Sequence, residues 1–445
     1  MIISMKIEGL SSWQIIQQEN GVGKVSFCGT VDEWLVNPVT DEEKKASADF
    51  LGVEFCFTDE EEGRPVTEYV KARNLENGKF KCEIENIPLG GLYTLKSRLV
   101  FKDYSWGGNT NIYHIAVGDI YLITGQSNAV GWSRGYFNEP IDLNVRMYSQ
   151  NVWNVASQPL DGQNYSPFIS FGKLLSKKLG YPIGLIPTAV GGSPLMSWVP
   201  EGNCFKQMKK LINGIDKIKG ILWYQGCTEA TDGFDGDYTQ EFKRFVSETR
   251  SIFGDDKIPV ITFQLNRLRD YAHVKISREG YSKIREIQRR MPEHINDLYV
   301  IPTIDLSAMS DAIHNSVMSN RMLGERTAEL ALDVIYHKQH AFKAPDIEKI
   351  EKIGDNKIKL IFKNVESSLD AFSVAPIDLP VRVEDENGIK EVASYEIDKN
   401  EITVTLSENV GNGAMASCQY GEDPKNIIID GNTQLPVLCF NKFKF

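Results

Sequence analysis

The chain has 445 residues, more than one hydrophobic core usually supports, so two or three domains are expected. Its hydrophobic fraction of 42% and charged fraction of 24% are those of an ordinary soluble globular protein. No stretch approaches the run of about 20 apolar residues that spans a bilayer. The net charge of −11, with no window rich in Lys and Arg, argues against nucleic-acid binding and favours a neutral partner.

The N-terminal residues lack a charged leader followed by a long apolar segment, so no signal peptide is expected and the predicted location is the cytoplasm. A secreted protein whose leader had been removed would give the same pattern. The seven cysteines are scattered and form no C-x-x-C pair, which indicates reduced thiols. The six histidines show no zinc-ligand spacing, so neither a metal nor another cofactor is expected.

The first part of the chain reads as short strands separated by turns. The turn signals include Asn77-Gly78 and Gly90-Gly91. We predict a sandwich-like N-terminal β domain over residues 1–115, with strands at 24–28, 52–57, 79–84 and 93–101.

The pattern of apolar residues changes after residue 115, where short apolar runs alternate with helical patterns. Such alternation predicts a parallel sheet with helices on both sides, here a catalytic domain over residues 116–342. In these sheets ligands bind beyond the carboxyl ends of the strands. The predicted strands are 120–124, 183–187, 218–224, 260–265 and 298–304, and the predicted helices are 168–179, 205–215, 238–253, 281–291 and 319–336.

After residue 343 the strand rhythm returns, punctuated by Asn387-Gly388 and by the glycines at 411 and 413. We predict a C-terminal β domain over residues 343–445, with strands at 357–362, 380–384, 401–406 and 414–420.

Ser127 follows the predicted strand 120–124, within the segment Gly-Gln-Ser-Asn. Gly125 permits a tight turn that exposes the serine hydroxyl and aims the Ser127 N–H at the same point. A nucleophile whose own amide helps to hold an oxyanion needs this arrangement. Taken alone, Gln-Ser-Asn fits a helix N-cap equally well.

Two further segments follow buried strands. Gly191-Gly192 comes after strand 183–187, and paired glycines let backbone N–H groups approach a ligand closely. Gln225 directly follows strand 218–224, where its amide can donate to a developing negative oxygen. Each also fits an ordinary strand end, as a plain loop turn or a hydrated polar side chain.

Asp311 and His314 lie three residues apart after strand 298–304. This spacing puts both side chains on one side of a helical turn, where a carboxylate can hold an imidazole in the tautomer that a general base needs. An isolated D-x-x-H is more commonly an N-cap beside a surface histidine. The order of the four segments favours a site, because each follows a strand of one parallel sheet and all four fall on one rim. We therefore predict Ser127, His314 and Asp311 as catalytic residues.

These segments resemble the blocks of SGNH-type hydrolases, specifically the sialate O-acetylesterase-like carbohydrate esterases. The matching blocks are Gly-Gln-Ser-Asn, Gly-Gly-Ser-Pro with a following Trp, Trp-Tyr-Gln-Gly and Asp-x-x-His, and the resemblance covers nearly the whole chain. It implies an α/β fold with a central flavodoxin-like sheet flanked by two β domains. It also implies a serine esterase that removes acetyl groups from an acetylated sugar or oligosaccharide. From charge and apolar patterning, neither nucleic acid nor a membrane is expected as a partner.

The predicted site follows from the same blocks. The amides of Ser127 and Gly192, with Gly191 as an alternative, and the Gln225 side chain would form the oxyanion hole. Aromatic faces suit the C–H surface of a sugar ring, although a core position is the commoner role of any tryptophan. The predicted substrate contacts are Trp198, with Trp132 as a weaker candidate, Asn128 and Glu229.

This chain departs from the family pattern after Gln-Gly, where Cys227 replaces the usual Glu and Glu229 stands where Asn or Asp is frequent. That places in doubt any substrate contact of the usual Glu. Cys227 is a less favoured nucleophile, because the only motif-paired histidine follows the serine pattern. The alternatives are a non-catalytic carbohydrate-binding homologue and a short-chain lipase or arylesterase on the same scaffold. A metal-dependent deacetylase is disfavoured by the histidine spacing.

Overall fold

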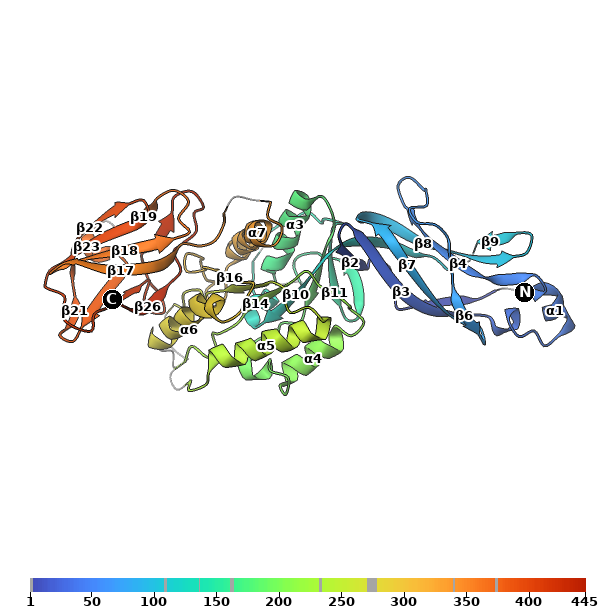
Figure 1. Cartoon of the computed structure of the whole chain (residues 1–445), viewed down its shortest axis with the longest axis horizontal. Coiled ribbons are helices and arrows are strands. Elements are labelled where there is room, and N and C mark those ends of the chain that lie inside the picture. Colours follow the sequence, from blue (N-terminus) through green and yellow to red (C-terminus); the bar gives the residue numbers. More distant parts are fainter. Residues whose placement is uncertain are drawn as a thin grey trace.

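A computed structural model describes residues 3–107, 110–135, 137–160, 164–231, 234–269, 278–338, 341–372 and 375–445. They form an elongated, sheet-rich α/β molecule with a helix-containing part between two β parts and the termini at opposite ends (Figure 1). Three clusters of buried hydrophobic side chains lie along it, one for each part. The domain boundaries given above stay predictions. Within these described ranges, no helix has the length and apolar character needed to cross a membrane.

The N-terminal part is built from long antiparallel strand pairs. β3 (Val22–Val31) pairs with β7 (Lys79–Pro88), and β4 (Phe50–Asp59) pairs with β8 (Gly90–Phe101). Residues of β3 alternate between exposed and buried, as expected for a strand with one face on a core. The remaining elements are β1 (Met5–Glu8), β2 (Ile15–Glu19), α1 (Asp41–Ser47), β5 (Val70–Lys71), β6 (Arg73–Glu76) and β9 (Ser105–Gly107).

One long strand, β10 (Ile112–Gly125), joins the N-terminal and central parts. Its first half pairs with β2 and β8, and its second half pairs with β13 (Ile183–Pro187) and β14 (Gly220–Tyr224). The strand therefore continues across the boundary predicted at residue 115.

The central strands are parallel in the spatial order β11 (Val145–Ser149), β13, β10, β14, β15 (Val260–Phe263) and β16 (Leu298–Ile301). β14 and β15 are buried along their whole length, which explains why they read as continuous apolar runs. The order reverses at β10, so a crevice is expected at its carboxyl end. The antiparallel strand β12 (Val152–Val155) forms the edge next to β11. The β11–β12 hairpin was not predicted.

Helices lie on two sides of these strands (Figure 1). α3 (Pro167–Leu179) and α7 (Val317–Val334) pack together on one side. α4 (Asn203–Leu211) and α5 (Tyr238–Phe253) lie on the other, and α6 (Arg278–Arg290) contacts the C-terminal part. The structure confirms helices close to all five predicted positions.

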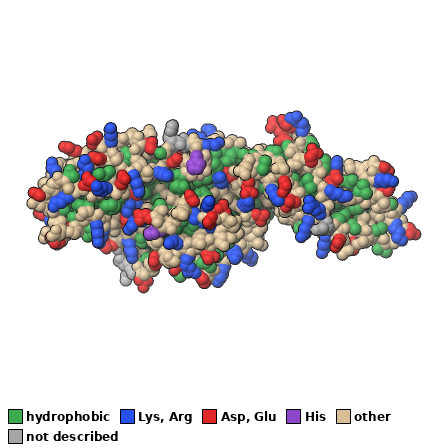
Figure 2. Space-filling view, viewed as in Figure 1, with side chains coloured by type: hydrophobic (Ala, Val, Ile, Leu, Met, Phe, Trp, Pro, Cys, Tyr) green, Lys and Arg blue, Asp and Glu red, His purple; other side chains and the backbone are tan. Residues whose placement is uncertain are grey.

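The C-terminal part consists of antiparallel strands. One sheet has the order β17 (Asp346–Gly354), β18 (Lys357–Lys363), β23 (Glu401–Leu406), β22 (Val392–Asp398). A second has the order β21 (Gly388–Lys390), β20 (Val381–Asp385), β24 (Met415–Cys418), β26 (Phe440–Lys444), and β19 (Leu369–Ala371) pairs with β25 (Ile428–Asp430). Acidic and basic side chains are interspersed over the face shown in Figure 2.

Candidate active site

The predicted nucleophile lies in a turn that is pressed against β14. Ser127 begins the short helix α2 (Ser127–Val130), directly after β10, and is 6% exposed. Gly125 has φ +120°, and a Cβ atom at this position would lie 2.3 Å from the carbonyl oxygen of Tyr224. The N–H of Gln126 donates to the same carbonyl at 2.9 Å. Only glycine fits at position 125, and it brings the serine to the carboxyl end of the central strand.

The predicted base and its carboxylate partner are in direct contact. His314 Nδ1 lies 2.7 Å from Asp311 Oδ2, and Asp311 Oδ1 accepts the backbone N–H groups of Ile313 and His314 at 3.2 and 3.1 Å. Burial works to raise the pKa of the Asp311 carboxyl, but the hydrogen bonds from His314 and Ile313 outweigh burial and leave this pKa below its ordinary value. An ionised Asp311 is suited to hold the Nδ1–H tautomer, which leaves Nε2 able to accept a proton.

Asn128 connects the serine turn to the histidine loop. Its Nδ2 donates to the carbonyl of Ile313 at 3.4 Å, and its Oδ1 accepts the N–H of Asn315 at 3.2 Å. The residue after Ser127 therefore binds the backbone on both sides of His314. Asn128 is only 2% exposed, and its contact with substrate stays a prediction. Its side chain is occupied in joining two loops.

The Ser127 hydroxyl and His314 Nε2 are not hydrogen-bonded to each other, or to any other residue in the part of the chain that the structure describes. The serine–histidine bond thus stays a prediction. In enzymes without substrate this bond is often longer than in the reacting complex.

The glycine pair lies beside the histidine loop, with Trp132 between them. A Cβ atom on Gly191 would lie 2.9 Å from the Trp132 ring, and this ring lies 5.4 Å from the His314 ring at an angle of 30°. The N–H of Trp132 donates to the carbonyl of Ser127 at 3.1 Å. Gly192 is exposed. These contacts bring three of the four sequence-predicted segments together at one place.

Gln225 and Glu229 are held inside the protein, which contradicts their predicted roles. The Gln225 amide donates to Glu229 Oε2 at 2.5 Å and to the carbonyl of Ser193 at 3.3 Å, and its oxygen accepts the Tyr238 hydroxyl at 3.0 Å. Gln225 is 0% exposed, so it has no free donor for an oxyanion. Glu229 also accepts the N–H of Leu195 at 2.6 Å and is 4% exposed, so it is enclosed away from substrate. Burial raises the pKa of Glu229.

Trp198, the main predicted floor for a sugar ring, is also wrong as a substrate contact. It is 0% exposed and packs edge-on against Trp223 and Phe245. Its Nε1 donates to Ser193 Oγ at 2.9 Å, and Ser193 in turn donates to the carbonyl of Val190 at 2.8 Å. Trp198 therefore supports the glycine loop from the core.

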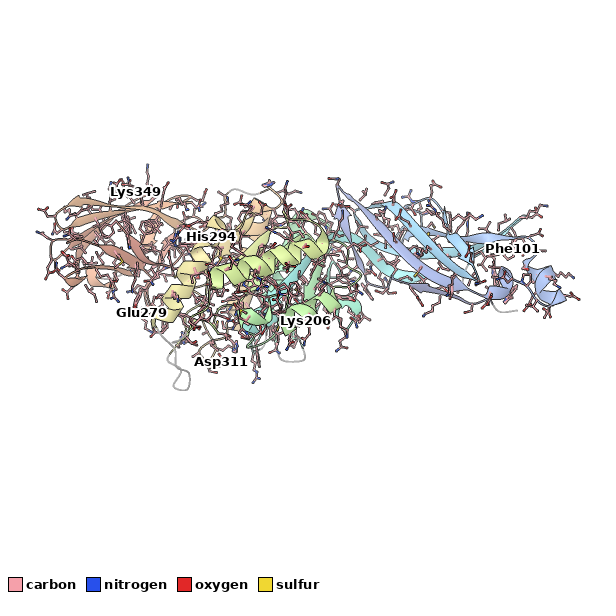
Figure 3. The ribbon with its side chains drawn as sticks, turned by 60° about the horizontal axis from the view of Figure 1, so that its bottom comes forward. Phe101, Lys206, Glu279, His294, Asp311 and Lys349 are labelled. Atoms are coloured by element: carbon pink, nitrogen blue, oxygen red, sulfur yellow. The ribbon has the colours of Figure 1, made fainter. Side chains whose placement is uncertain are left out.

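Trp132 is the exposed aromatic residue of this region. Its side chain is 40% exposed and lines a cavity of about 490 Å³. The other lining residues are Arg134, Met309, Ser310, Asp311, His314 and Ser316. Asp311 lies at the lower side of the central part in Figure 3. The weaker of the two predicted tryptophans is thus the one placed to touch a ligand.

Two other features bear on the chemistry. Burial raises the pKa of the Cys227 thiol to about 11, so the thiol is protonated at neutral pH and is a poor nucleophile. Within the described ranges, no group of three or more His, Cys, Asp or Glu residues is arranged to hold a metal ion.

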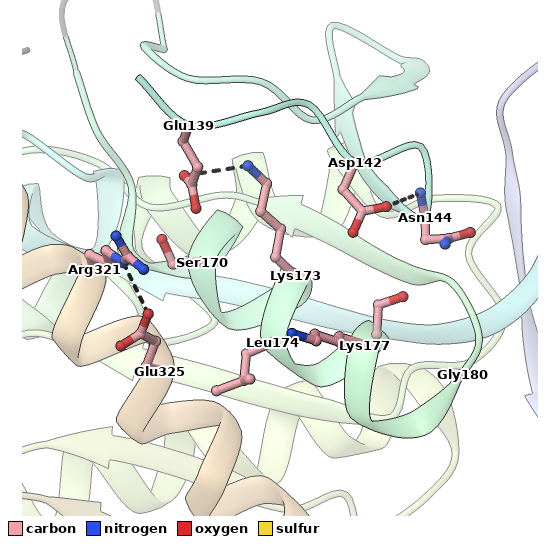
Figure 4. Close-up of a pocket in the computed structure, with 11 residues that line it drawn as sticks. Glu139, Asp142, Asn144, Ser170, Lys173, Leu174, Lys177, Gly180, Arg321 and Glu325 are labelled. Carbon is pink, nitrogen blue, oxygen red and sulfur yellow. Dashed lines mark hydrogen bonds and ion pairs between the residues drawn. The ribbon is translucent and has the colours of Figure 1, made fainter. Parts of the chain in front are cut away.

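A second cavity, of about 500 Å³, lies between α3 and α7 (Figure 4). Its charged residues are largely paired with one another, Lys173 with Glu139 at 3.4 Å and Arg321 with Glu325 at 3.0 Å. None of the predicted site residues lines it.

Comparison with known proteins identifies the central part. Residues 117–333 match the family model described as "Carbohydrate esterase, sialic acid-specific acetylesterase", which places this part of the chain in the class of carbohydrate esterases. Within that class, the match is to the sialic acid-specific acetylesterases, and it covers a little under half of the chain. The match supports an ester-hydrolysing enzyme.

Two relatives show how far the likeness extends. The solved structure of a carbohydrate acetylesterase from Xanthomonas citri superposes with a TM-score of 0.70 at 19% identity, covering 99% of both chains, so the whole fold is shared. A probable carbohydrate esterase of Arabidopsis thaliana is 23% identical over 246 residues, which are 48% of this chain and 90% of that relative.

Proposed function

We propose that this protein is a carbohydrate O-acetylesterase with Ser127 as nucleophile, His314 as general base and Asp311 as its partner. The observation that carries the proposal is the pair of hydrogen bonds made by the Asn128 side chain. It ties the turn of Ser127 to the backbone on both sides of His314, while Asp311 holds the opposite ring nitrogen at 2.7 Å. Nucleophile, base and base-orienting carboxylate are thus linked at the carboxyl end of the central strand.

In the first half-reaction, Ser127 Oγ attacks the acetyl carbonyl carbon and His314 Nε2 takes the hydroxyl proton. The imidazolium is stabilised by the ionised Asp311. When the tetrahedral intermediate collapses, its bond to the sugar oxygen breaks and His314 returns the proton to that oxygen. The products are the free sugar hydroxyl and acetyl-Ser127.

The backbone supports an oxyanion hole of two amides. Within the described chain, the N–H groups of Ser127 and Gly192 donate to no protein acceptor. We assign both to the oxyanion, with Gly191 as the alternative to Gly192. Two such donors can supply several kcal/mol, since the loss of a single donor in an oxyanion hole costs about 3–4 kcal/mol in the barrier.

In the second half-reaction, water takes the position that the sugar has left. His314 accepts one proton from this water as its oxygen attacks the acetyl carbon. Collapse of the second intermediate breaks the bond to Ser127 Oγ, which regains its proton from His314, and acetate leaves.

We place the sugar on the His314 side of Trp132. His314 must protonate the leaving oxygen, so the leaving sugar has to lie next to its ring. The cavity of about 490 Å³ adjoins His314 and Asp311, and the indole of Trp132 forms part of its wall. The apolar face of a sugar ring can pack on this indole, and the substrate is an acetylated sugar or a short acetylated oligosaccharide.

The finer features of the fold belong to the same proposal. The order of the parallel strands around β10 supports an SGNH-type, flavodoxin-like catalytic domain over residues 116–342. Antiparallel sheets before and after it support flanking β domains over 1–115 and 343–445. A cytoplasmic location is also proposed.

The direct test is the substitution Ser127→Ala, assayed for acetate release from 4-nitrophenyl acetate and from a panel of acetylated oligosaccharides. Loss of a catalytic serine lowers kcat by at least about 10⁴-fold. The matched control is Ser176→Ala on α3, because Ser176 is also buried and its hydroxyl donates to the carbonyl of Tyr181 at 2.8 Å, away from the site.

An active Ser127→Ala variant would refute the serine mechanism. A wild-type protein that binds acetylated oligosaccharides but releases no acetate would support the binding-protein alternative. A preference for long-chain over acetyl esters of 4-nitrophenol would support a lipase instead.

A further inference from the structure

The C-terminal β part contacts the central part through a buried arginine on α6. Arg285 is 0% exposed, and its guanidinium donates only to backbone carbonyl oxygens. Two acceptors follow β15 and two lie in the loop after β24; they are Leu265 at 2.8 Å, Asn266 at 2.8 Å, Gly421 and Glu422 at 3.2 Å. Arg285 thus fastens a loop of the C-terminal part to the loop at the carboxyl end of β15.

The same two loops are also joined by a direct backbone bond, in which the N–H of Leu268 donates to the carbonyl of Glu422 at 2.8 Å. The N–H of Gly421 donates to the side chain of Ser282 on α6, at 2.9 Å from Oγ. Gln264, just beyond β15, exchanges two hydrogen bonds with the backbone of Cys439 at 2.8 and 2.9 Å. Residues 264–269 therefore have their position set partly by the C-terminal part.

Residues 264–269 in turn contact the loop of the proposed catalytic base. Asn266 Nδ2 donates to Asn315 Oδ1 at 2.7 Å, and the N–H of Arg269 donates to the carbonyl of Ala312 at 3.1 Å. Asn266 and Asn315 are 4% and 0% exposed. These two bonds hold the segment that carries His314 from residues 266 and 269, in addition to the bonds from Asn128.

We propose that Arg285 and Asn266 are positioning residues through which residues 421–422 of the C-terminal part hold His314 in register with Ser127. The path runs from Arg285 to Asn266, then to Asn315, and on to Asn128 beside the serine. The C-terminal part then helps to set the geometry of the catalytic site. This role is independent of any carbohydrate binding by the C-terminal part. The inference rests on the proposed roles of Ser127 and His314.

Hydrogen bonding gives the physical reason. A guanidinium has five N–H donors in a rigid plane, so one Arg can fix several carbonyl oxygens of two loops relative to one another. Lysine has a single point of charge and cannot reproduce that geometry. The Ser127–His314 pair is sensitive to such placement, since a shift of about 1 Å at a reacting group can cost about 100-fold in rate.

The test compares three variants in the full-length protein, with 4-nitrophenyl acetate as substrate. Arg285→Lys keeps the charge but loses the planar guanidinium with its several N–H donors. Asn266→Ala removes the bond to Asn315, and Ser282→Ala removes the acceptor of the Gly421 N–H. We expect Arg285→Lys and Asn266→Ala to lower kcat by about 10–100-fold, with KM within about twofold of wild type. Ser282→Ala should lower kcat in the same direction by a smaller factor. The acid limb of the pH profile of kcat/KM should shift in all three, because the surroundings of His314 change.

Matched controls separate positioning from general destabilisation. Arg250 is 8% exposed and also donates to backbone carbonyls, those of Ile258 and Asn296, but it lies at the opposite end of β15. Asn320 is 1% exposed and donates to the carbonyl of Tyr165 at 2.7 Å. Arg250→Lys and Asn320→Ala should lower the melting temperature, as the test variants do, while kcat and the pH profile stay at wild-type values.

Wild-type kcat and pH profile in both Arg285→Lys and Asn266→Ala would overturn the inference, as would an equal loss of kcat in Arg250→Lys. If Arg285→Lys fails to fold, Asn266→Ala decides alone. Unchanged kcat in Ser282→Ala, with the expected loss in the other two variants, would assign the hold on residues 421–422 to Arg285 and Leu268 alone. An active Ser127→Ala variant would instead refute the proposed mechanism, so the two failures are distinguishable.

Discussion

A buried carboxylate at the junction of the N-terminal and central parts gives the sharpest stability prediction. Asp119 lies in the middle of β10 and is 0% exposed. Its Oδ1 accepts the side-chain amides of Gln17 and Gln18 at 2.7 and 3.1 Å, and its Oδ2 accepts the hydroxyls of Tyr181 and Tyr336 at 2.9 and 2.8 Å. The substitution Asp119→Ala would remove the acceptor of all four donors at once.

The expected cost follows from which donors find another partner. Tyr336 keeps the Tyr121 hydroxyl at 2.7 Å, and the Gln17 amide keeps the carbonyl of Gln18 at 3.0 Å. The other two donors, the Gln18 amide and the Tyr181 hydroxyl, lose a charged acceptor. A hydrogen bond to a charged group contributes about 1.5–3 kcal/mol, so Asp119→Ala should lower the free energy of unfolding by about 4 kcal/mol. Asp119→Asn should lose only about 1–2 kcal/mol, because its amide can still pair with all four groups.

Urea unfolding followed by far-UV circular dichroism measures this difference. With a slope near 3 kcal/mol/M, the midpoint of Asp119→Ala should fall by about 1 M or more. A loss below about 1 kcal/mol in the Ala variant, or an equal loss in the Asn variant, would show that these four bonds do not stabilise the junction.

Three further predictions concern the candidate site. Asp311→Asn should lower kcat for 4-nitrophenyl acetate by about 10³–10⁴-fold, because an amide favours the wrong tautomer of His314; more than a tenth of wild-type activity would contradict this. Gly191→Val should lower kcat by about tenfold or more, since its side chain would displace the Trp132 ring, and Gly191→Val with Trp132→Ala should regain part of the loss. Burial raises the pKa of Glu229, so the folded state binds this proton more tightly than the unfolded state. The contribution of Glu229 to stability is therefore present at low pH and is lost as pH rises from about 4.3, the ordinary Glu value, through the raised pKa. The unfolding free energy of wild type relative to Glu229→Gln should fall as pH rises above about 4.3, and a constant difference would argue against a raised pKa.

The central strands and helices could be predicted from the sequence because their patterns are strong. A parallel strand buried on both faces reads as a short apolar run, and α5 appears at the predicted residues 238–253. The strand β11 was missed because it carries Arg146, which local rules place at the surface. Arg146 is 0% exposed and donates to backbone carbonyls of residues 13, 14 and 114, which lie far away in the sequence. No local pattern reports such partners.

The candidate site shows the same limit. The sequence predicts where Ser127, Asp311 and His314 lie, because each follows a strand of the same sheet. It does not predict which aromatic residue faces solvent. Trp198 and Trp132 are both tryptophans close to a predicted motif, and the sequence does not distinguish them. In the structure, Trp198 packs against Phe245 on α5 while Trp132 is 40% exposed. Burial depends on elements that the motif does not contain.

The enclosed polar residues also explain why a motif at a strand end is ambiguous. Loops that leave a parallel sheet lose the ladder that satisfied their backbone groups, so buried N–H groups there need side-chain acceptors. Gln126 accepts the N–H groups of Gly226 and Cys227, and Glu229 accepts that of Leu195. A polar residue after a buried strand is therefore expected both where chemistry occurs and where a loop must be held. In this chain, the residues proposed for catalysis and the residues that hold loops by hydrogen bonds lie at the same edge of the sheet. The loops held in this way carry Ser127, Gly192 and His314.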